Sequence, residues 1–248
     1  MLPEERKALI LEYIDSQHAV TATELMQRFD ASEATIRRDL TDMDKKGFIQ
    51  KVHGGAVSLN SPLAVDYKVS ERMDKNIDEK ILIAKHAAGL IQNNDLVFLD
   101  AGTSTYHIID YIDAPNVTFV TNAIMHAKKL AANGYSVFLT GGRLKATTEA
   151  LVGSECYESI LHYHFSIGFF GANAVNHADG FTTPDPEEAK IKECALSRTH
   201  SPYILCDHTK FDLTSNARFS FFEDAHIITA GRLPKSYHKA KNITLLTN

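Results

Sequence analysis

The spacing of apolar residues changes near residue 58, and this change constrains the fold more than any other feature of the sequence. Before it, apolar residues recur every three or four positions, which is typical of short amphipathic helices. After it, short apolar runs of strand length alternate with helical patterns. The chain of 248 residues is long enough for two unequal domains. We therefore expect a first domain over residues 1–58, a linker and the start of a connecting helix over 59–80, and a second domain over 81–248.

Three short helices and a β-hairpin are expected in the first domain. An apolar stripe predicts a helix over residues 4–16, and a second helix begins after Thr21, whose spacing to a glutamate three residues on is that of a capping box. Ser32 can cap a third helix. Apolar and polar residues alternate over 48–52 and resume after a glycine turn at 56–58, which indicates a hairpin. This order predicts a winged helix-turn-helix.

The third helix carries two adjacent arginines opposite its apolar face. At 100° per residue, Arg37 and Arg38 point away from Ile36, as in a helix that reads the DNA major groove. The whole chain has a formal charge of −5, but residues 35–53 hold five bases and three acids, so only this face is basic. Solvation of a helix surface is the alternative role for the arginines. The candidate contacts to double-stranded operator DNA are Ser32, Thr35, Arg37, Arg38, Lys51 and His53.

The second domain is predicted to be of the α/β class. Helical patterns over residues 124–132 and 187–195 lie among six short apolar runs, and runs without polar alternation are typical of strands covered on both faces. These runs are 95–99, 117–120, 136–139, 165–170, 203–206 and 225–228. The alternation predicts a Rossmann-like, mainly parallel sheet.

Small and polar residues follow the predicted strands, where ligands of open α/β sheets bind. Hydroxyls and backbone N–H groups after residue 99 could hold a phosphate, and carboxylates could hold sugar hydroxyls. The preference of glycine and aspartate for strand-to-helix turns could also explain each loop without a ligand. The nucleotide-binding glycine motifs are absent from the sequence. The candidate effector-binding residues are Asp100, Gly102, Thr103, Ser104, Thr105, Asn122, Gly141, Gly142, Arg143, Lys145, Lys192, Asp207 and Lys210.

Two groups of motifs resemble the DeoR family of bacterial transcription repressors. The first is the run from Ser32 to Leu40 followed by the Val-His-Gly-Gly-Ala segment at 52–56. The second is the series of effector-domain blocks at Asp100–Thr105, Val120–Asn122, Thr140–Arg143, Gly180–Thr183, Glu188–Lys192 and Asp207–Lys210. The resemblance implies a repressor that senses a sugar phosphate. Further blocks, such as Lys145–Thr148, look most like fructose-operon repressors, whose effector is fructose 1-phosphate.

The effector domain of this family is similar in fold to ribose-5-phosphate isomerase, which raises the alternative of a sugar-phosphate isomerase with an N-terminal interaction module. The isomerase's acidic segment falls on Gly171-Ala172-Asn173-Ala174, where both carboxylates are missing. Isomerisation needs a base to move a proton between neighbouring carbons. We therefore expect a regulator without catalytic activity. A DNA-binding scaffold with a ligand-free second domain is the other alternative.

The remaining composition points to a cytoplasmic protein. Its three cysteines have no Cys-x-x-Cys spacing, its N-terminus is charged, and no apolar run reaches membrane-spanning length, so we expect neither secretion nor membrane insertion. His162 and His164 lack a third metal ligand, and Cys206 is expected in the core. No cofactor is expected. Paired DNA half-sites favour a homo-oligomer, either a dimer or a tetramer.

Overall fold

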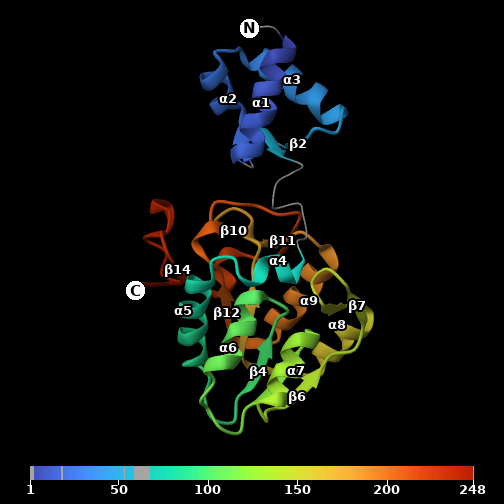
Figure 1. Cartoon of the computed structure of the whole chain (residues 1–248), viewed down its shortest axis with the longest axis vertical. Helices are drawn as coiled ribbons and strands as arrows, with labels where there is room; N and C mark the ends of the chain where they lie inside the picture. The colour runs from blue at the N-terminus through green and yellow to red at the C-terminus, as the bar shows by residue number, and fades with distance from the viewer. Residues whose placement is uncertain (1–2, 18, 53, 59–67, 248) are drawn as a thin grey trace. The chain divides into compact units, whose positions relative to one another are not determined.

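The computed structural model describes residues 3–17, 19–52, 54–58 and 68–247. It divides into two compact units, Met1–Val65 and Asp66–Asn248. Figure 1 labels the elements of both units. Residues 59–67, within the predicted linker, lie outside the described residues. The boundary predicted at residue 58 therefore stays a prediction.

The first unit is a winged helix-turn-helix, which confirms the predicted fold. Its described elements are α1 (Pro3–Gln17), β1 (Ala19–Thr21), α2 (Ala22–Phe29), α3 (Glu33–Lys45), β2 (Ile49–Val52) and β3 (Gly55–Ser58). The strands form an antiparallel sheet in the order β1-β3-β2. The sequence did not predict β1, because three residues are too few to show a strand period.

Local signals in the first unit act as predicted. The Thr21 hydroxyl accepts a hydrogen bond from the Glu24 N–H at 3.2 Å, and the Glu24 carboxylate accepts one from the Thr21 N–H at 2.7 Å. This capping box starts α2. Helices and sheet bury one apolar core, whose buried members are Ile10, Ile14, Leu25, Ile36, Leu40, Met43, Val20, Ile49 and Ala56.

The second unit is built on a parallel sheet of seven described strands, which confirms the Rossmann-like prediction. In spatial order these are β15 (Ile243–Leu246), β14 (His226–Ala230), β12 (Thr199–Leu205), β9 (Phe165–Gly171), β4 (Leu96–Leu99), β5 (Thr118–Thr121) and β6 (Ser136–Leu139). All six strand pairs are parallel. The six predicted runs are all strands of this sheet, whereas β15 was not predicted.

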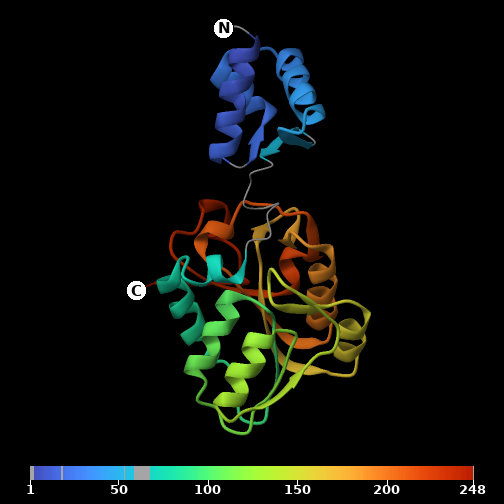
Figure 2. The ribbon, with the colours of Figure 1, turned by 45° about the vertical axis from the view of Figure 1, so that its right-hand side comes forward.

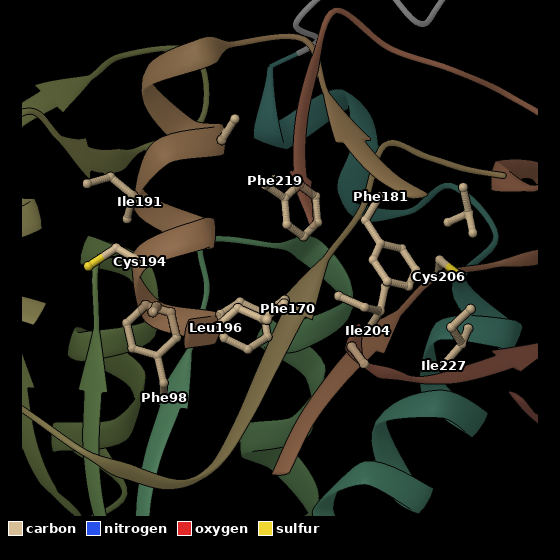
Figure 3. Packing of buried hydrophobic residues seen from close by; sticks show 14 of the residues in the cluster. Phe98, Phe170, Phe181, Ile191, Cys194, Leu196, Ile204, Cys206, Phe219 and Ile227 are labelled. Carbon is tan, nitrogen blue, oxygen red and sulfur yellow. The ribbon is translucent and has the colours of Figure 1, made fainter. Parts of the chain in front are cut away.

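Helices cover both faces of the sheet, so the buried strands have apolar residues on each side. The helices α5 (Ile77–Ala88), α6 (Thr103–Ile108) and α7 (Ile124–Ala132) pack on one face; in Figure 2 they are the teal and green helices. The helices α8 (Ser154–Leu161) and α9 (Pro186–Ser197) pack on the other. Figure 3 shows part of this second core, including Phe98, Phe170 and Cys206.

Shorter elements complete the second unit. They are α4 (Val69–Met73), the antiparallel strands β10 (Ala174–Asn176), β11 (Gly180–Thr183) and β13 (Ala217–Ser220), the pair β7 (Arg143–Lys145) and β8 (Ala150–Val152), and the 3-10 turns η1 (Ile109–Tyr111), η2 (His208–Lys210), η3 (Phe222–Asp224) and η4 (Lys235–Tyr237). Of the three phenylalanines in and after β13, Phe219 and Phe222 are buried and Phe221 is exposed.

Two predictions about the second unit are wrong. Strand β6 was expected to be covered on both faces, but it is the edge of the sheet, and Phe138 is 51% and Leu139 44% exposed. Residues 59–80 were expected to be a linker and the start of a solvated connecting helix. The described part, residues 68–80, forms α4 and the first turn of α5, and the expected solvation is wrong for one residue of that turn. Lys80, in that turn, is only 4% exposed.

Candidate functional site

Helix α3 presents its two arginines to solvent, as its period predicts. Its N-cap is Ser32, whose hydroxyl accepts the Thr35 N–H at 3.3 Å and lies 2.9 Å from the Thr35 hydroxyl. Arg37 is paired with Glu33 one turn away at 2.6 Å. Arg38 is exposed and has no ion pair or hydrogen bond to any described residue. Of the two arginines, Arg38 is therefore the one whose guanidinium is available to a ligand.

The aspartate after these arginines is structural. Asp39 is buried, and its carboxylate accepts a hydrogen bond from Arg6 Nε of α1 at 2.7 Å. A second pair, Lys7 to Asp42 at 2.6 Å, joins the same two helices. Two ion pairs thus hold α3 against α1, and the exposed face of α3 carries Arg37 and Arg38.

The hairpin of β2 and β3 is the wing of this fold, and Lys51 of β2 connects it to the end of α3. The Lys51 backbone N–H donates to Asp44 Oδ1 at 2.8 Å, and its ammonium donates to the Thr41 hydroxyl at 2.7 Å. Lys51 is exposed beside α3, where a DNA backbone could replace Thr41 as its partner. His53, the other predicted wing contact, lies outside the described residues.

In the second unit, a pocket lies at the carboxyl ends of β4, β9 and β12. The strand order reverses between β4 and β9, so the pocket occupies the switch point at which open α/β sheets bind ligands. Its volume is about 620 Å³ including the open mouth. The lining residues are Arg72, Lys75, Lys80, Ala101, Gly102, Thr103, Ser104, Gly171, Ala172, Asn173, Glu188, Lys192, Leu205, Cys206, Asp207 and Lys210.

A buried ion pair joins the two strands at the switch point. The Lys192 ammonium, from α9, donates to the Asp100 carboxylate and to the Gly171 carbonyl, the latter at 3.0 Å. Asp100 Oδ2 also accepts the Gly171 N–H at 3.0 Å. Lys192 faces the pocket, whereas Asp100 lies behind it at 2% exposure. Asp100 therefore positions Lys192 and is not itself a lining group.

The loop after β4 divides its hydroxyls between two tasks. Thr103 and Ser104 line the pocket together with Gly102. Thr105 is fully buried, and its hydroxyl contacts the Asp100 carbonyl at 2.6 Å and His126 Nε2 at 3.0 Å. The predicted phosphate loop thus contributes two hydroxyls to the pocket, and Thr105 fixes the shape of the loop.

The segment after β12 adds a carboxylate and a cation. Asp207 Oδ1 accepts hydrogen bonds from Asn76 Nδ2 at 2.9 Å and from the Thr209 N–H at 3.0 Å. Burial raises the pKa of Asp207, but Lys210 and these hydrogen bonds outweigh burial, so its pKa lies below the usual value. Asp207 is therefore an anionic acceptor beside the Lys210 cation.

Three further cations of the pocket come from α4, α5 and their connection and were not predicted as site residues. The guanidinium of Arg72 has Nε and Nη2 buried without a hydrogen-bond partner among the described residues, and Lys75 is exposed at the rim. The Lys80 ammonium donates to the carbonyls of Arg72 and, at 3.4 Å, Met73. Burial lowers the pKa of Lys80 to about 8; Lys210 and Arg72 also lower it, and Asp207 opposes them.

Besides Asp100 and Thr105, five other predicted effector residues do not line this pocket. Gly141 and Gly142 form the turn after β6, and the Asn122 amide donates to the Leu151 carbonyl at 3.2 Å. The other two are basic and pair with acids at the start of α9. Arg143 pairs with Glu187, and Lys145 pairs with Asp185 at 2.5 Å and with Glu188 at 3.2 Å. Lys145 reaches the pocket only through Glu188.

Comparison with known proteins agrees with both units. Residues 6–62 match the DeoR-like helix-turn-helix domain, and residues 75–231 match the DeoR C terminal sensor domain. The chain belongs to the DeoR family. This membership confirms the resemblance drawn from the motifs, and it makes the chain a regulator and not an enzyme.

Relatives of this DeoR-family regulator cover nearly all of its length. It is 40% identical over 230 residues to the uncharacterized HTH-type transcriptional regulator FruR of Bacillus subtilis, covering 92% of this chain and 91% of that protein. It is 32% identical over 209 residues to the lactose phosphotransferase system repressor of Staphylococcus aureus, covering 83% of each. Among solved structures, ribose 5-phosphate isomerase from Plasmodium falciparum matches with a TM-score of 0.41 and 15% identity, covering 54% of this chain and 52% of that chain.

Other predicted groups have ordinary structural roles. His164 Nε2 lies 2.7 Å from Arg198, and neither His162 nor His164 belongs to a metal-ligating group of the described residues. Cys206 is buried, and burial raises the pKa of its thiol. Within the described part of the chain, no helix has the length and apolar character needed to cross a membrane.

Proposed function

We propose that this DeoR-family regulator represses a carbohydrate operon, with fructose use as the leading candidate, and that a phosphorylated sugar such as fructose 1-phosphate releases it from operator DNA. The name of the Bacillus relative and the fructose-type blocks of the sequence support this operon. The proposed site of action is the cytoplasm, which also suits three free cysteines.

The observation that carries the proposal is the charge of the pocket. Five basic side chains line it, against the two carboxylates of Glu188 and Asp207. Arg72 in addition holds two buried donor atoms without a partner, and a phosphate oxygen would satisfy them. An excess of cations with unused donors favours an anionic ligand, and Lys192, Lys210, Thr103 and Ser104 complete the proposed phosphate contacts.

The acceptors in the same pocket favour a sugar phosphate over a simple anion. Asp207, Glu188 and Asn173 line one cavity with the cations. Carboxylate and amide oxygens accept hydrogen bonds from hydroxyls. Toward phosphate, a carboxylate is repulsive and an amide oxygen has no proton to donate. A ligand that carries both a phosphate and several hydroxyls therefore uses the whole lining.

The test combines ligand binding with DNA release. Thermal-shift titration of the full chain with fructose 1-phosphate, fructose 6-phosphate and tagatose 6-phosphate should show stabilisation by at least one of them, because a ligand of the native state raises the melting temperature. A gel shift on DNA upstream of its own operon should show release by the same compound. No stabilisation by any phosphorylated sugar would favour the ligand-free scaffold, and tighter DNA binding would reverse the sign of regulation.

Effector affinity is expected to fall between pH 7 and pH 9. Lys80 has a pKa of about 8 in the free protein, and an adjacent phosphate favours its charged form. If only the charged form binds, about a tenth of the protein is competent at pH 9, so affinity falls about tenfold. Calorimetric titration checks this result. The Lys80→Arg variant stays charged and should show a flat profile; a flat wild-type profile would contradict the role of Lys80.

The same shift predicts the pH dependence of stability without ligand. The unfolded chain holds the Lys80 proton up to its ordinary pKa of 10.5, whereas the folded chain loses it near pH 8. Since the unfolded state binds more protons in this window, the Lys80 contribution to the free energy of unfolding rises from pH 8 to 10.5.

Strand β6 is proposed as part of a homo-oligomer interface. It is an open sheet edge with Phe138 and Leu139 exposed, and Phe138 lies 6.1 Å from the ring of Tyr163. An open apolar edge invites pairing with another chain, and paired reading units would span two DNA half-sites. The interface would therefore allow the protein to bind an operator that contains two half-sites.

Replacing Phe138 with lysine is expected to weaken self-association at least about tenfold, because a charge on an edge strand opposes pairing. Light scattering after size-exclusion chromatography, over a range of concentrations, measures the change. Leu245→Lys is the matched control, since Leu245 is an exposed residue of the opposite edge strand, β15. Equal effects of the two variants, or none, would remove β6 as the interface.

A further inference from the structure

A second, smaller cavity adjoins the anion pocket. The two share residues 101–103 in their linings, so a ligand in the pocket would lie next to the cavity. Met73 of α4 and Met125 and His126 of α7 also line the cavity. It has room for about one water-sized group. A hydroxyl group would fit, whereas a whole sugar ring would not.

His126 is the polar side chain that distinguishes this cavity. It is 4% exposed, and its Nε2 lies 3.0 Å from the Thr105 hydroxyl. The single hydroxyl proton of Thr105 is given to a backbone carbonyl, either Asp100 at 2.6 Å or Gly102 at 2.8 Å. The Thr105 oxygen is therefore an acceptor toward His126, and Nε2 must be the donor.

The other ring nitrogen is then an acceptor without a donor. Burial lowers the pKa of His126 to about 4, so the ring is neutral at pH 7 and its single proton is on Nε2. Nδ1 is buried and has no hydrogen-bond partner among the described residues. A buried acceptor without a hydrogen bond destabilises the folded state, which indicates that a group absent from the structure donates to it.

No described residue of the cavity wall, the Thr103 hydroxyl included, lies within hydrogen-bond distance of Nδ1 as a donor. The Thr148 hydroxyl, which also lines the cavity, is already given to Glu188 at 2.5 Å. The flanking methionines have no donor atoms, and Tyr106 contacts the His126 ring edge to face at 5.3 Å. Nδ1 is therefore open to a donor from a molecule that enters the cavity.

We propose that this cavity receives one hydroxyl of the effector sugar, with His126 Nδ1 accepting its hydrogen bond. The inference rests on the proposed sugar-phosphate function and assigns the sugar end of the ligand: the phosphate binds among the cations, and a hydroxyl reaches past residues 101–103 to His126. Phosphorylated compounds without a hydroxyl at that position would bind only through their phosphate.

Two substitutions separate the two nitrogens of His126. Glutamine places an amide N–H near Nε2 and keeps a donor for Thr105, but it removes the acceptor. Asparagine places an oxygen near Nδ1 and keeps the acceptor, but it gives up Thr105. Dissociation constants for fructose 1-phosphate and for inorganic phosphate are measured on the full chain by thermal-shift titration. His126→Gln should weaken fructose 1-phosphate binding about 5- to 10-fold and leave inorganic phosphate unchanged.

Each outcome decides between specific alternatives. His126→Asn should keep the affinity for fructose 1-phosphate within about threefold of wild type. If His126→Gln weakens both ligands equally, His126 only supports the loop, and if it weakens neither, a water fills the cavity; either result overturns the inference and leaves the proposed function intact. A wild type that binds fructose 1-phosphate no more tightly than inorganic phosphate would instead contradict the proposed effector as well.

Discussion

Replacing Lys192 with methionine is expected to abolish effector binding and to lower the free energy of unfolding by about 3–5 kcal/mol. The side chains of Lys192 and Asp100 are 7% and 3% exposed, and the substitution leaves the Asp100 carboxylate buried without its cation. It also removes a cation from the pocket lining. Urea unfolding and titration with fructose 1-phosphate measure the two losses separately.

The double variant Asp100→Asn with Lys192→Met is the control for this prediction. It removes both charges, so most of the lost stability should return, because an uncharged pair of similar volume is often as stable as a buried ion pair. Effector binding should not return, since the cation is still missing. Recovery of binding in the double variant would show that Lys192 acts only by neutralising Asp100.

Replacing Arg38 with alanine is expected to weaken operator binding about 10- to 100-fold for each half-site. Arg38 is exposed on α3 without a partner among the described residues, whereas Arg37 must first leave Glu33. Arg37→Ala is therefore the matched comparison and should cost less. Fluorescence anisotropy with operator DNA at several salt concentrations measures both.

The salt series also separates the two kinds of contact. If Arg38 binds a phosphate, Arg38→Ala should lower the slope of log affinity against log salt by about one, with little change in sequence preference. If Arg38 reads a base, sequence preference relaxes at one position. A larger loss for Arg37→Ala than for Arg38→Ala would contradict the assignment of Arg38 as the free reader.

The sequence predicts the elements whose signal is local. Ser32 and Thr21 cap helices through partners only three residues away, so composition and spacing suffice. Helix α7 has the bounds predicted for it, because it is amphipathic over nine residues. By contrast, the exposure of β6 depends on its place in the strand order, and that order is not encoded in the run 136–139 itself.

The site residues divide in the same way, into those with a local signal and those that depend on distant partners. Loops after strands point to Thr103, Asp207 and Lys210, since parallel strands end at one edge of the sheet. Arg143 follows a strand too, yet it pairs with Glu187, 44 residues later, and does not line the pocket. No local pattern shows such a long-range partner.

The burial of Lys80 could have been predicted from the sequence. Lys80 lies one turn before Ala84 and three residues before Ile83, on the buried stripe of α5, although its charge suggested a solvated helix. A lysine on an apolar stripe needs a compensating environment, and the carbonyls of Arg72 and Met73 provide it. The helical spacing of Lys80 therefore predicts its burial better than its charge does.

Helix α4 has five residues, no side-chain cap and no buried residue, so its own backbone bonds cannot keep it helical in water. Its anchors are the Val69 N–H to Thr147 carbonyl bond at 3.0 Å and the Lys80 ammonium on its last carbonyls. An anion that engages Arg72 and Lys80 would add anchors to the same turn. We therefore expect an occupied pocket to make the backbone of residues 69–73 more rigid, and unfolding of this single turn to be the structural response to an empty pocket.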